Sequence, residues 1–201
     1  TRILSSAASD VYKRQELKGS ADLNMQGQSF KLEFYSLKNN QNQSLSTVSA
    51  GGMQVQKSVF NKDQGYNVVN GQKIILSEDE LEQALTDSKL FSELSYDYEI
   101  VKLVGSSTID DQKVYEIKIS DNNTEYYSIE TGLKVKEVEN QLIDGNQIII
   151  ETTIKEYREV NGILIPSEIN QVTPAVPIPG GITIKFNTIE LNVESSDSDF
   201  N

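Results

Sequence analysis

The chain has 201 residues, 37% of them hydrophobic, and its 18 basic and 30 acidic side chains give a formal net charge of −12. This length fits one ordinary domain or one large all-β domain, and the acidic balance argues against nucleic-acid binding, which needs clustered Lys and Arg. Because the sequence has no cysteine and no histidine, a Cys nucleophile, Ser-His-Asp catalysis, His-ligated zinc and disulfides are excluded within this chain.

The first fifteen residues do not follow the pattern of the rest. Thr1–Gln15 lacks sustained alternation, and Ser5–Gln15 resembles a foreign end that recurs on unrelated chains assembled from environmental DNA. We interpret 1–15 as a non-native segment that pairs with no strand, and assign 16–201 to a single domain. No signal peptide is visible, and no apolar run reaches the ~18 residues that a membrane-spanning helix needs.

From Glu16 onward, apolar and polar residues alternate with period two, which predicts β-strands. The first expected strands are Glu16–Met25, Phe30–Lys38, Ser44–Ala50, Met53–Phe60 and Tyr66–Val69. Asn70-Gly71 is the strongest hairpin signal in the chain, because both residues tolerate the positive φ of a type I′ turn.

A single helical interruption is predicted to begin at Ser77. Ser77 and Glu80 form a capping box, and the acidic residues that follow Ser77 suit the positive end of a helix dipole. Helical spacing continues to a break near Asp87-Ser88 and resumes at Leu90, after which we expect Tyr96–Val104 to return to strand.

A meander of antiparallel strands is predicted over Lys113–Arg158, with reversals at Asn, Asp and Gly residues. Gly132 is expected at positive φ in one of these turns. Further on, Asn161-Gly162 predicts another tight turn. In the last long run, Ile182–Val193, the apolar positions change from even to odd numbers midway, which predicts a bulge or a sharp bend.

Ten or more strands in one antiparallel sheet will curl, so the concave face must be covered by helices or filled by a ligand. The residues expected to line that face are Leu23, Met25, Phe30, Leu32, Phe34, Met53, Val55, Tyr115, Ile117, Ile119, Ile184 and Phe186. Each could equally well fill a core. One short helical segment cannot obviously cover so many strands, however, and this favours a persistent apolar cavity.

Other candidate chemistry is weak. Asp110-Asp111, Asp121–Asn123 and Asp144–Asn146 lack the ligand spacing of a calcium loop, and turn formation explains them, so no metal site is predicted. Glu125-Tyr126 could support acid-base chemistry, but we expect it on the outer face of a strand, where there is no pocket. No catalytic residue and no cofactor is predicted.

Several segments resemble a LolA-like family of envelope proteins found in Bacteroidetes-type bacteria, the outer-membrane lipoprotein-sorting proteins. They are Gly52–Val55, Tyr126–Leu133, Glu156–Arg158, Asn161–Ile163 with Pro166, and Ile189–Asn192, and the resemblance covers about Glu16 to Phe200. Similar segments follow the zinc-peptidase modules of some insulinase-like (M16) proteins.

The resemblance implies a mainly β fold, a half-open antiparallel β-barrel (LolA/LolB/LppX-like) of about eleven strands, a size at which such sheets curl. It also implies a short helical insertion at the mouth and a cavity that binds lipid or lipoprotein acyl chains without catalysis, in the periplasm or cell envelope. The alternative is a structural or interaction domain attached C-terminally to a secreted M16-type peptidase, with no lipid cargo. An envelope or peptidase partner would then act with it, and any peptidase activity would lie in a module outside this chain.

Overall fold

The structure is a computed structural model that describes residues 12–25, 28–143, 146–174, 178–194 and 196–200. These residues form thirteen antiparallel strands in one sheet, with one α-helix and two 3-10 helices. The elements are β1 (Arg14–Met25), β2 (Gln28–Asn39), β3 (Gln43–Ala50), β4 (Met53–Asn61), β5 (Gln64–Val69), β6 (Gln72–Ile75), α2 (Glu78–Asp87), η1 (Ser92–Ser95), β7 (Lys102–Ile109), β8 (Gln112–Lys118), β9 (Asn123–Ser128), β10 (Lys134–Ile143), β11 (Asn146–Val160), β12 (Ile163–Val172), β13 (Ile182–Leu191) and η2 (Asp197–Phe200).

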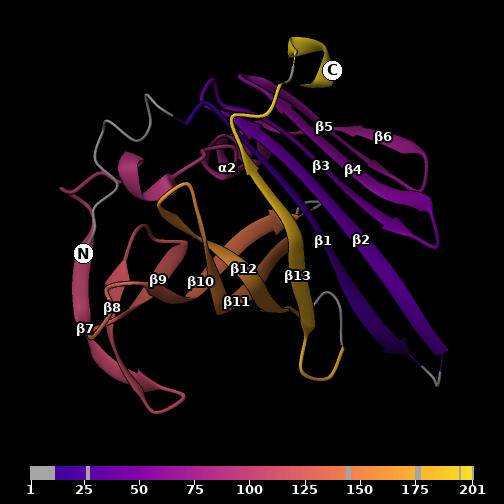
Figure 1. Ribbon diagram of the computed structural model, residues 1–201. Helices are drawn as coiled ribbons and strands as arrows, with labels where there is room; N and C mark the ends of the chain where they lie inside the picture. Colours follow the sequence, from indigo (N-terminus) through magenta and orange to yellow (C-terminus); the bar gives the residue numbers. More distant parts are fainter. Residues whose placement is uncertain (1–11, 26–27, 144–145, 175–177, 195, 201) are drawn as a thin grey trace.

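The sheet is an open barrel whose strand order is β6-β5-β4-β3-β2-β1-β13-β12-β11-β10-β9-β8-β7. β6 and β7 are therefore its two unpaired ends, although they are neighbours along the chain. The connection between them carries α2 and η1, and Figure 1 shows α2 lying over the face that the curled sheet encloses. This confirms the predicted mainly β, half-open barrel with a short helical insertion.

Tight turns set the strand order, and the sequence predicted the main ones. Asn70 and Gly71 have φ values of 50° and 82°, and Asn161 and Gly162 have values of 52° and 82°. Two positive φ values in succession are those of a type I′ turn. Gly132 has a φ of 71°, as expected, and its N–H donates to Ser128 O at 2.9 Å.

Thirteen strands are present, rather than about eleven. A hairpin at each end extends the sheet: Asn70-Gly71 adds the four-residue β6, and a turn at Asp110-Asp111, with φ values of 46° and 63°, adds β7. These acidic turn residues thus have a structural role. Among the described residues, no group of three or more Asp and Glu side chains is arranged to hold a metal ion.

The predicted change of face in the last strand is a β-bulge. Lys18 of β1 pairs with Thr188, and the next residue, Gly19, pairs with Phe186, so Asn187 is the extra residue on β13. A bulge of this kind keeps the even-numbered apolar residues before it on the same face as the odd-numbered ones after it. Ile184, at 6% exposure, and Ile189, at 8%, are accordingly both buried.

The prediction that Thr1–Gln15 stays outside the fold is wrong for its last residues. Arg14 and Gln15 pair with Asn39 and Lys38, and the Tyr12 hydroxyl donates to Asn161 O at 2.9 Å. Tyr12 also packs against the buried cluster formed by Ile163, Ile165 and Ile189, as do Leu17, Phe91, Val160, Phe186 and Leu191. These contacts arise because β1 begins at Arg14 and pairs with β2 along its whole length. Residues 1–11 lie outside the described part, and the non-native origin of the segment stays a prediction.

The predicted strand Tyr96–Val104 begins only at Lys102. Residues 92–95 form the 3-10 helix η1, and a turn follows in which the N–H groups of Ile100 and Val101 both donate to Asp97 O. Tertiary contacts of Tyr96, described below, hold this stretch against the sheet and override its alternating pattern.

The convex side is covered at one place by the C-terminal 3-10 helix η2, which contacts β3 and β4. Phe200 is almost completely buried there, as are Leu37 and Val59, which lie on the opposite side of the sheet from α2. Within the described residues, no helix is both long enough and apolar enough to cross a membrane.

Candidate functional site

The segment that connects β6 to β7 crosses the concave face of the sheet. Its helix α2 starts with the predicted capping box: Glu80 N–H donates to Ser77 Oγ, and Ser77 N–H donates to Glu80 Oε2 at 2.8 Å. The helix ends at Asp87, where the C-cap Ser88 N–H bonds to Ala84 O. None of its residues is buried, so α2 spans the face without packing deeply onto it.

A fully buried carboxylate holds the far end of this segment. Glu125 of β9 accepts hydrogen bonds from the hydroxyls of Tyr96, at 2.6 Å, and Tyr127, at 2.5 Å. The Lys134 ammonium of β10 lies 2.7 Å from the same carboxylate and 3.2 Å from Glu137. A buried charge needs such partners, because removal from water costs several kcal/mol.

The register of β9 and β10 brings these charges together. Glu125 and Glu137 are cross-strand partners, so their side chains point to the same face. A register shift between Lys134 and Lys136 then turns Lys134 onto that face as well, opposite Tyr127. Burial lowers the pKa of Lys134, but the carboxylates of Glu125, Glu137 and Glu93 outweigh it and raise that pKa well above its ordinary value. Lys134 is therefore charged.

Burial has the opposite consequence for the phenols of this ionic cluster, which comprises Glu125, Lys134, Glu137, Tyr96 and Tyr127. The pKa values of Tyr96 and Tyr127 are raised, first by burial and then by the neighbouring negative charge of Glu125. Both hydroxyls consequently keep their protons and act as donors. The cluster is a structural tie between the connecting segment and the sheet.

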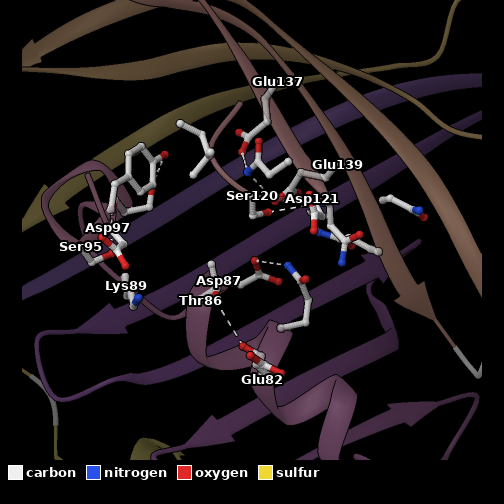
Figure 2. A pocket seen from close by; sticks show the side chains of 18 of the residues that line it. Glu82, Thr86, Asp87, Lys89, Ser95, Asp97, Ser120, Asp121, Glu137 and Glu139 are labelled. Carbon is white, nitrogen blue, oxygen red and sulfur yellow. Dashed lines mark hydrogen bonds between the residues drawn. The ribbon is translucent and has the colours of Figure 1, made fainter. Parts of the chain in front are cut away.

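Next to this cluster lies a cavity of about 830 Å³ between α2, η1 and the β8–β10 strands (Figure 2). Its lining is almost entirely polar: Lys38, Asp79, Glu82, Gln83, Thr86, Asp87, Lys89, Ser92, Ser95, Tyr96, Asp97, Ile100, Ile119, Ser120, Asp121, Asn122, Asn123, Glu137, Glu139, Asn140, Gln141 and Gln147. Figure 2 shows Glu82 and Asp87 of α2 on one side of the space and Glu137 and Glu139 of β10 on the other. We call this space the acidic cavity.

Glu139 is the most perturbed carboxyl in the acidic cavity. Burial, and after it the negative charges of Glu137 and Asp87, raise its pKa from 4.5 to about 7. Asn123 Nδ2 donates to Glu139 Oε1 at 3.3 Å, and Gln141 Nε2 donates to Oε2 at 2.9 Å. Opposite it, the pKa of Asp87 is also raised, because the surrounding protein partly shields its carboxyl group from water, although the nearby Lys38 counteracts this.

The twelve residues predicted to line an apolar cavity lie mostly on the concave face. Cross-strand partners point to the same side of a sheet, and the pairs Leu23–Phe30, Ala21–Leu32 and Gly19–Phe34 place the β1–β2 residues together. Met53 pairs with Ala50, itself the partner of Leu32, and Phe186 pairs with Gly19. The concave-face set so identified is Leu23, Phe30, Leu32, Phe34, Met53, Tyr115, Ile117, Ile119, Ile184 and Phe186, with Val55 at a bulge of β4.

Only one of these twelve residues, Ile119, lines the acidic cavity. Among the others, Leu23 and Ile184 are buried, whereas Phe30 is 45% exposed, Tyr115 43% and Met53 73%, so part of the set is apolar and accessible. The side chain of Met25 lies outside what the structure describes. The concave face therefore has two parts, an apolar surface away from α2 and an acidic cavity beneath it.

The acidic part of the concave face was not predicted from the sequence. The prediction that Glu125 lies on an outer face is wrong, because Glu125 is fully buried on the concave side, opposite Ile117 of β8. One feature of the sequence did indicate the correct face. Glu125 and Tyr127 are two residues apart in the same strand, so their side chains point to the same side of the sheet. Lys134 carried no such signal, because the bulge beside it changes its face.

No family model and no curated protein matches the chain. Solved structures do resemble it. A LolA superfamily protein from Nitrosomonas europaea has a TM-score of 0.63 at 14% identity, covering 94% of this chain and 90% of the other. A DUF1329 family protein from Desulfovibrio piger has a TM-score of 0.57 at 13% identity, covering 97% and 92%.

A third similar structure is a putative outer membrane lipoprotein-sorting protein domain from Vibrio parahaemolyticus, with a TM-score of 0.55 at 10% identity and coverage of 94% and 89%. At these identities the similarity concerns the fold. The chain has the fold of the LolA-like open barrels.

Proposed function

We propose that this protein binds lipid or lipoprotein acyl chains on the concave face of its sheet, without catalysis, in the periplasm or cell envelope. The similar structures from Nitrosomonas europaea and Vibrio parahaemolyticus, one described as LolA superfamily and one as a lipoprotein-sorting domain, support the proposal by analogy of fold. The proposal assigns no catalytic residue, metal or cofactor to the chain.

The observation that carries the proposal is an apolar concave surface that α2 does not cover. Phe30, Leu32 and Phe34 follow one another on the concave side of β2, and Leu103 at the other end of the sheet pairs with Ile117. Leu103 is 65% exposed, and α2 buries none of its own residues. Accessible apolar side chains on the concave face suit a binding site for apolar ligands.

Burial of an acyl chain on this surface supplies the binding energy. Each methylene removed from water contributes about 0.8 kcal/mol, so a chain of ordinary length gains several kcal/mol even when only part of it is covered. This part of the binding energy comes from the acyl chain alone and does not depend on the head group.

The test is a binding titration with an anthroyloxy-labelled stearate. Leu32→Asn puts a polar group on the concave surface, where a bound chain would desolvate it at a cost of roughly 1–3 kcal/mol. We expect roughly ten-fold weaker binding. Lys31→Asn is the matched control, because Lys31 is the exposed neighbour that points to the convex side, opposite Asp22. It should bind like wild type.

Both variants need urea unfolding curves, because Leu32 is half-buried and its loss also costs stability. If the folded wild type binds no probe, the transport proposal fails. The remaining interpretation would then be the structural or interaction domain beside a secreted peptidase. The filled, hydrogen-bonded ionic cluster around Glu125 would suit such a role.

A further inference from the structure

The apolar surface leads directly into the acidic cavity. On β2, alternate residues share a face, so the row that contains Phe34 continues through Ser36 to Lys38, which lines the cavity. The two ends of this row are about 13 Å apart at the ordinary strand rise. On β8, Ile117 is followed on the same side by Ile119, which also lines the cavity. A single amphiphile can therefore contact both parts of the face.

The cavity has an excess of negative charge. Seven carboxylates line it, against two lysines: Asp79, Glu82, Asp87, Asp97, Asp121, Glu137 and Glu139, against Lys38 and Lys89. The Lys38 ammonium already donates to the backbone oxygen of Asp87, and burial lowers the pKa of Lys38. The lining thus offers many oxygen acceptors and few cations.

Two acceptors in the cavity lining are buried and lack a donor. Asn123 Oδ1 and Asn140 Oδ1 are both shielded from solvent, and no hydrogen-bond donor of the described residues reaches either. An unsatisfied buried polar atom is costly, roughly 1–3 kcal/mol, and most native ones have a partner. The same Asn123 donates through its Nδ2 to Glu137 and Glu139, so its amide holds two of the carboxylates of the cavity in place.

We infer that the acidic cavity receives the cationic, N–H-bearing end of the bound amphiphile, a protonated primary amine. This inference rests on the proposed function. A primary ammonium carries a compact charge and three donors, so it can bond more than one of the carboxylate oxygens that line the cavity. A phosphate or a carboxylate head group would instead meet like charges and would be repelled.

Ammonium binding has a proton signature. Glu139 has a pKa of about 7, so near that pH about half of the molecules carry a proton on it. A cation beside the carboxylate favours its charged form and lowers that pKa. Binding at pH 7 therefore releases protons to the buffer. Calorimetry in two buffers of different ionisation enthalpy measures how many.

The experiment compares dodecylamine with laurate, which have equal chain length and opposite head groups, by isothermal titration at pH 7. We expect the amine to bind at least ten-fold more tightly than the acid and to release protons on binding. Glu139→Gln should weaken amine binding about ten-fold, abolish the proton release and leave laurate binding unchanged or stronger. Glu33→Gln, an exposed position on the opposite side of β2, is the control and should behave as wild type.

A second variant guards against a folding defect. Asp87→Asn removes a carboxylate from the other wall of the cavity, on α2, and should weaken amine binding in the same way. If laurate and dodecylamine bind equally, and neither variant changes the amine, the inference is wrong and the proposed function stands. If neither amphiphile binds and 1,4-diaminobutane does not bind either, the proposed function and the inference both fail.

A further titration, with 1,4-diaminobutane, shows whether the amine belongs to a lipid or is a free small molecule. If 1,4-diaminobutane binds in a Glu139-dependent way and neither amphiphile binds, the cavity takes a free amine. The ammonium chemistry then holds, and the lipid proposal does not. If 1,4-diaminobutane binds much more weakly than dodecylamine, the ligand is an amino-bearing lipid or acylated molecule, as inferred.

Discussion

The hydroxyl of Tyr96 donates to the buried carboxylate of Glu125 at 2.6 Å, and this bond joins the segment between the two edges of the sheet to its concave floor. Glu93, three residues before Tyr96, adds a longer contact of 3.6 Å to Lys134. Residues that are remote in sequence thereby set the position of the segment that overlies the cavity. The stability of that attachment is open to direct measurement.

Tyr96→Phe should lower the free energy of unfolding by about 1–3 kcal/mol, because one donor to a buried charge is lost and the others remain. Tyr98→Phe is a matched control, because Tyr98 is 77% exposed. Urea unfolding of the two variants provides the comparison. Equal midpoints would mean that the Tyr96–Glu125 bond does not hold the segment.

Glu125→Gln should cost more, about 2–4 kcal/mol, because it removes one partner of a buried ion pair. The loss is limited, since Glu137 still lies 3.2 Å from the Lys134 ammonium. The control is Glu151→Gln, which breaks the partly exposed pair with Lys136 at 2.5 Å. Exposed pairs contribute roughly 0–1 kcal/mol, so this variant should unfold almost like wild type. A larger effect at Glu151 than at Glu125 would contradict the assignment.

Local chemistry explains which features could be predicted from the sequence. The type I′ turn at Asn70-Gly71, the positive φ of Gly132 and the capping box at Ser77 each depend on a few adjacent residues. The bulge in β13 was predictable too. On a half-buried strand, one extra residue moves the apolar positions from even to odd numbers, and this change is visible in the sequence.

The acidic cavity could not be predicted in this way, because it depends on contacts between distant segments. Glu125 is buried only because Lys134, across a bulge, and Tyr96, from the connecting segment, both reach it. The late start of β7 has the same origin. The alternation of apolar and polar residues predicts to which side of the sheet a side chain points, but not which other segments cover that side.

Gly132→Val should destabilise the protein by at least ~1 kcal/mol, because φ at this position is 71° and a β-branched residue is strained there. Gly105→Val is the control within a strand: a Cβ at Gly105 meets no atom within 4 Å, and its φ is not in the left-handed region. Thermal unfolding should separate the two variants by several degrees. If they unfold alike, the strain at Gly132 is not what limits that turn.

Two truncations distinguish the residues of the N-terminal segment that contact the sheet from residues 1–11, which lie outside the described part of the chain. Deletion of residues 1–11 should leave the thermal midpoint unchanged if they are a non-native end. Deletion of 1–15 removes Tyr12 from the Ile163 cluster and two residue pairs between β1 and β2, so it should lower the midpoint by several degrees. A large loss from the shorter deletion would refute the non-native interpretation.

Glu139 should make stability depend on pH in a defined direction. It faces Glu137 and Lys134 of β10, Asp87 of α2 and Lys38 of β2, with donors from Asn123 and Gln141. Its pKa is about 7 in the folded protein, against 4.5 for the ordinary carboxyl. The folded state therefore holds this proton more tightly than the unfolded chain, and its contribution is fully present below pH 4.5 and is lost as pH rises through 7.

Glu139→Gln removes this titration while it keeps the size of the side chain. The variant should match wild type near pH 4.5 and become more stable than it by pH 8, by up to about 3 kcal/mol on the basis of 1.36 kcal/mol per pKa unit. Urea unfolding at both pH values measures the difference between the two proteins, in which the titration of all other groups cancels. Glu33→Gln, exposed on the convex side, should give parallel curves. Parallel curves for Glu139→Gln as well would show that its carboxyl titrates normally, and the acidic cavity would then be better hydrated than its geometry indicates.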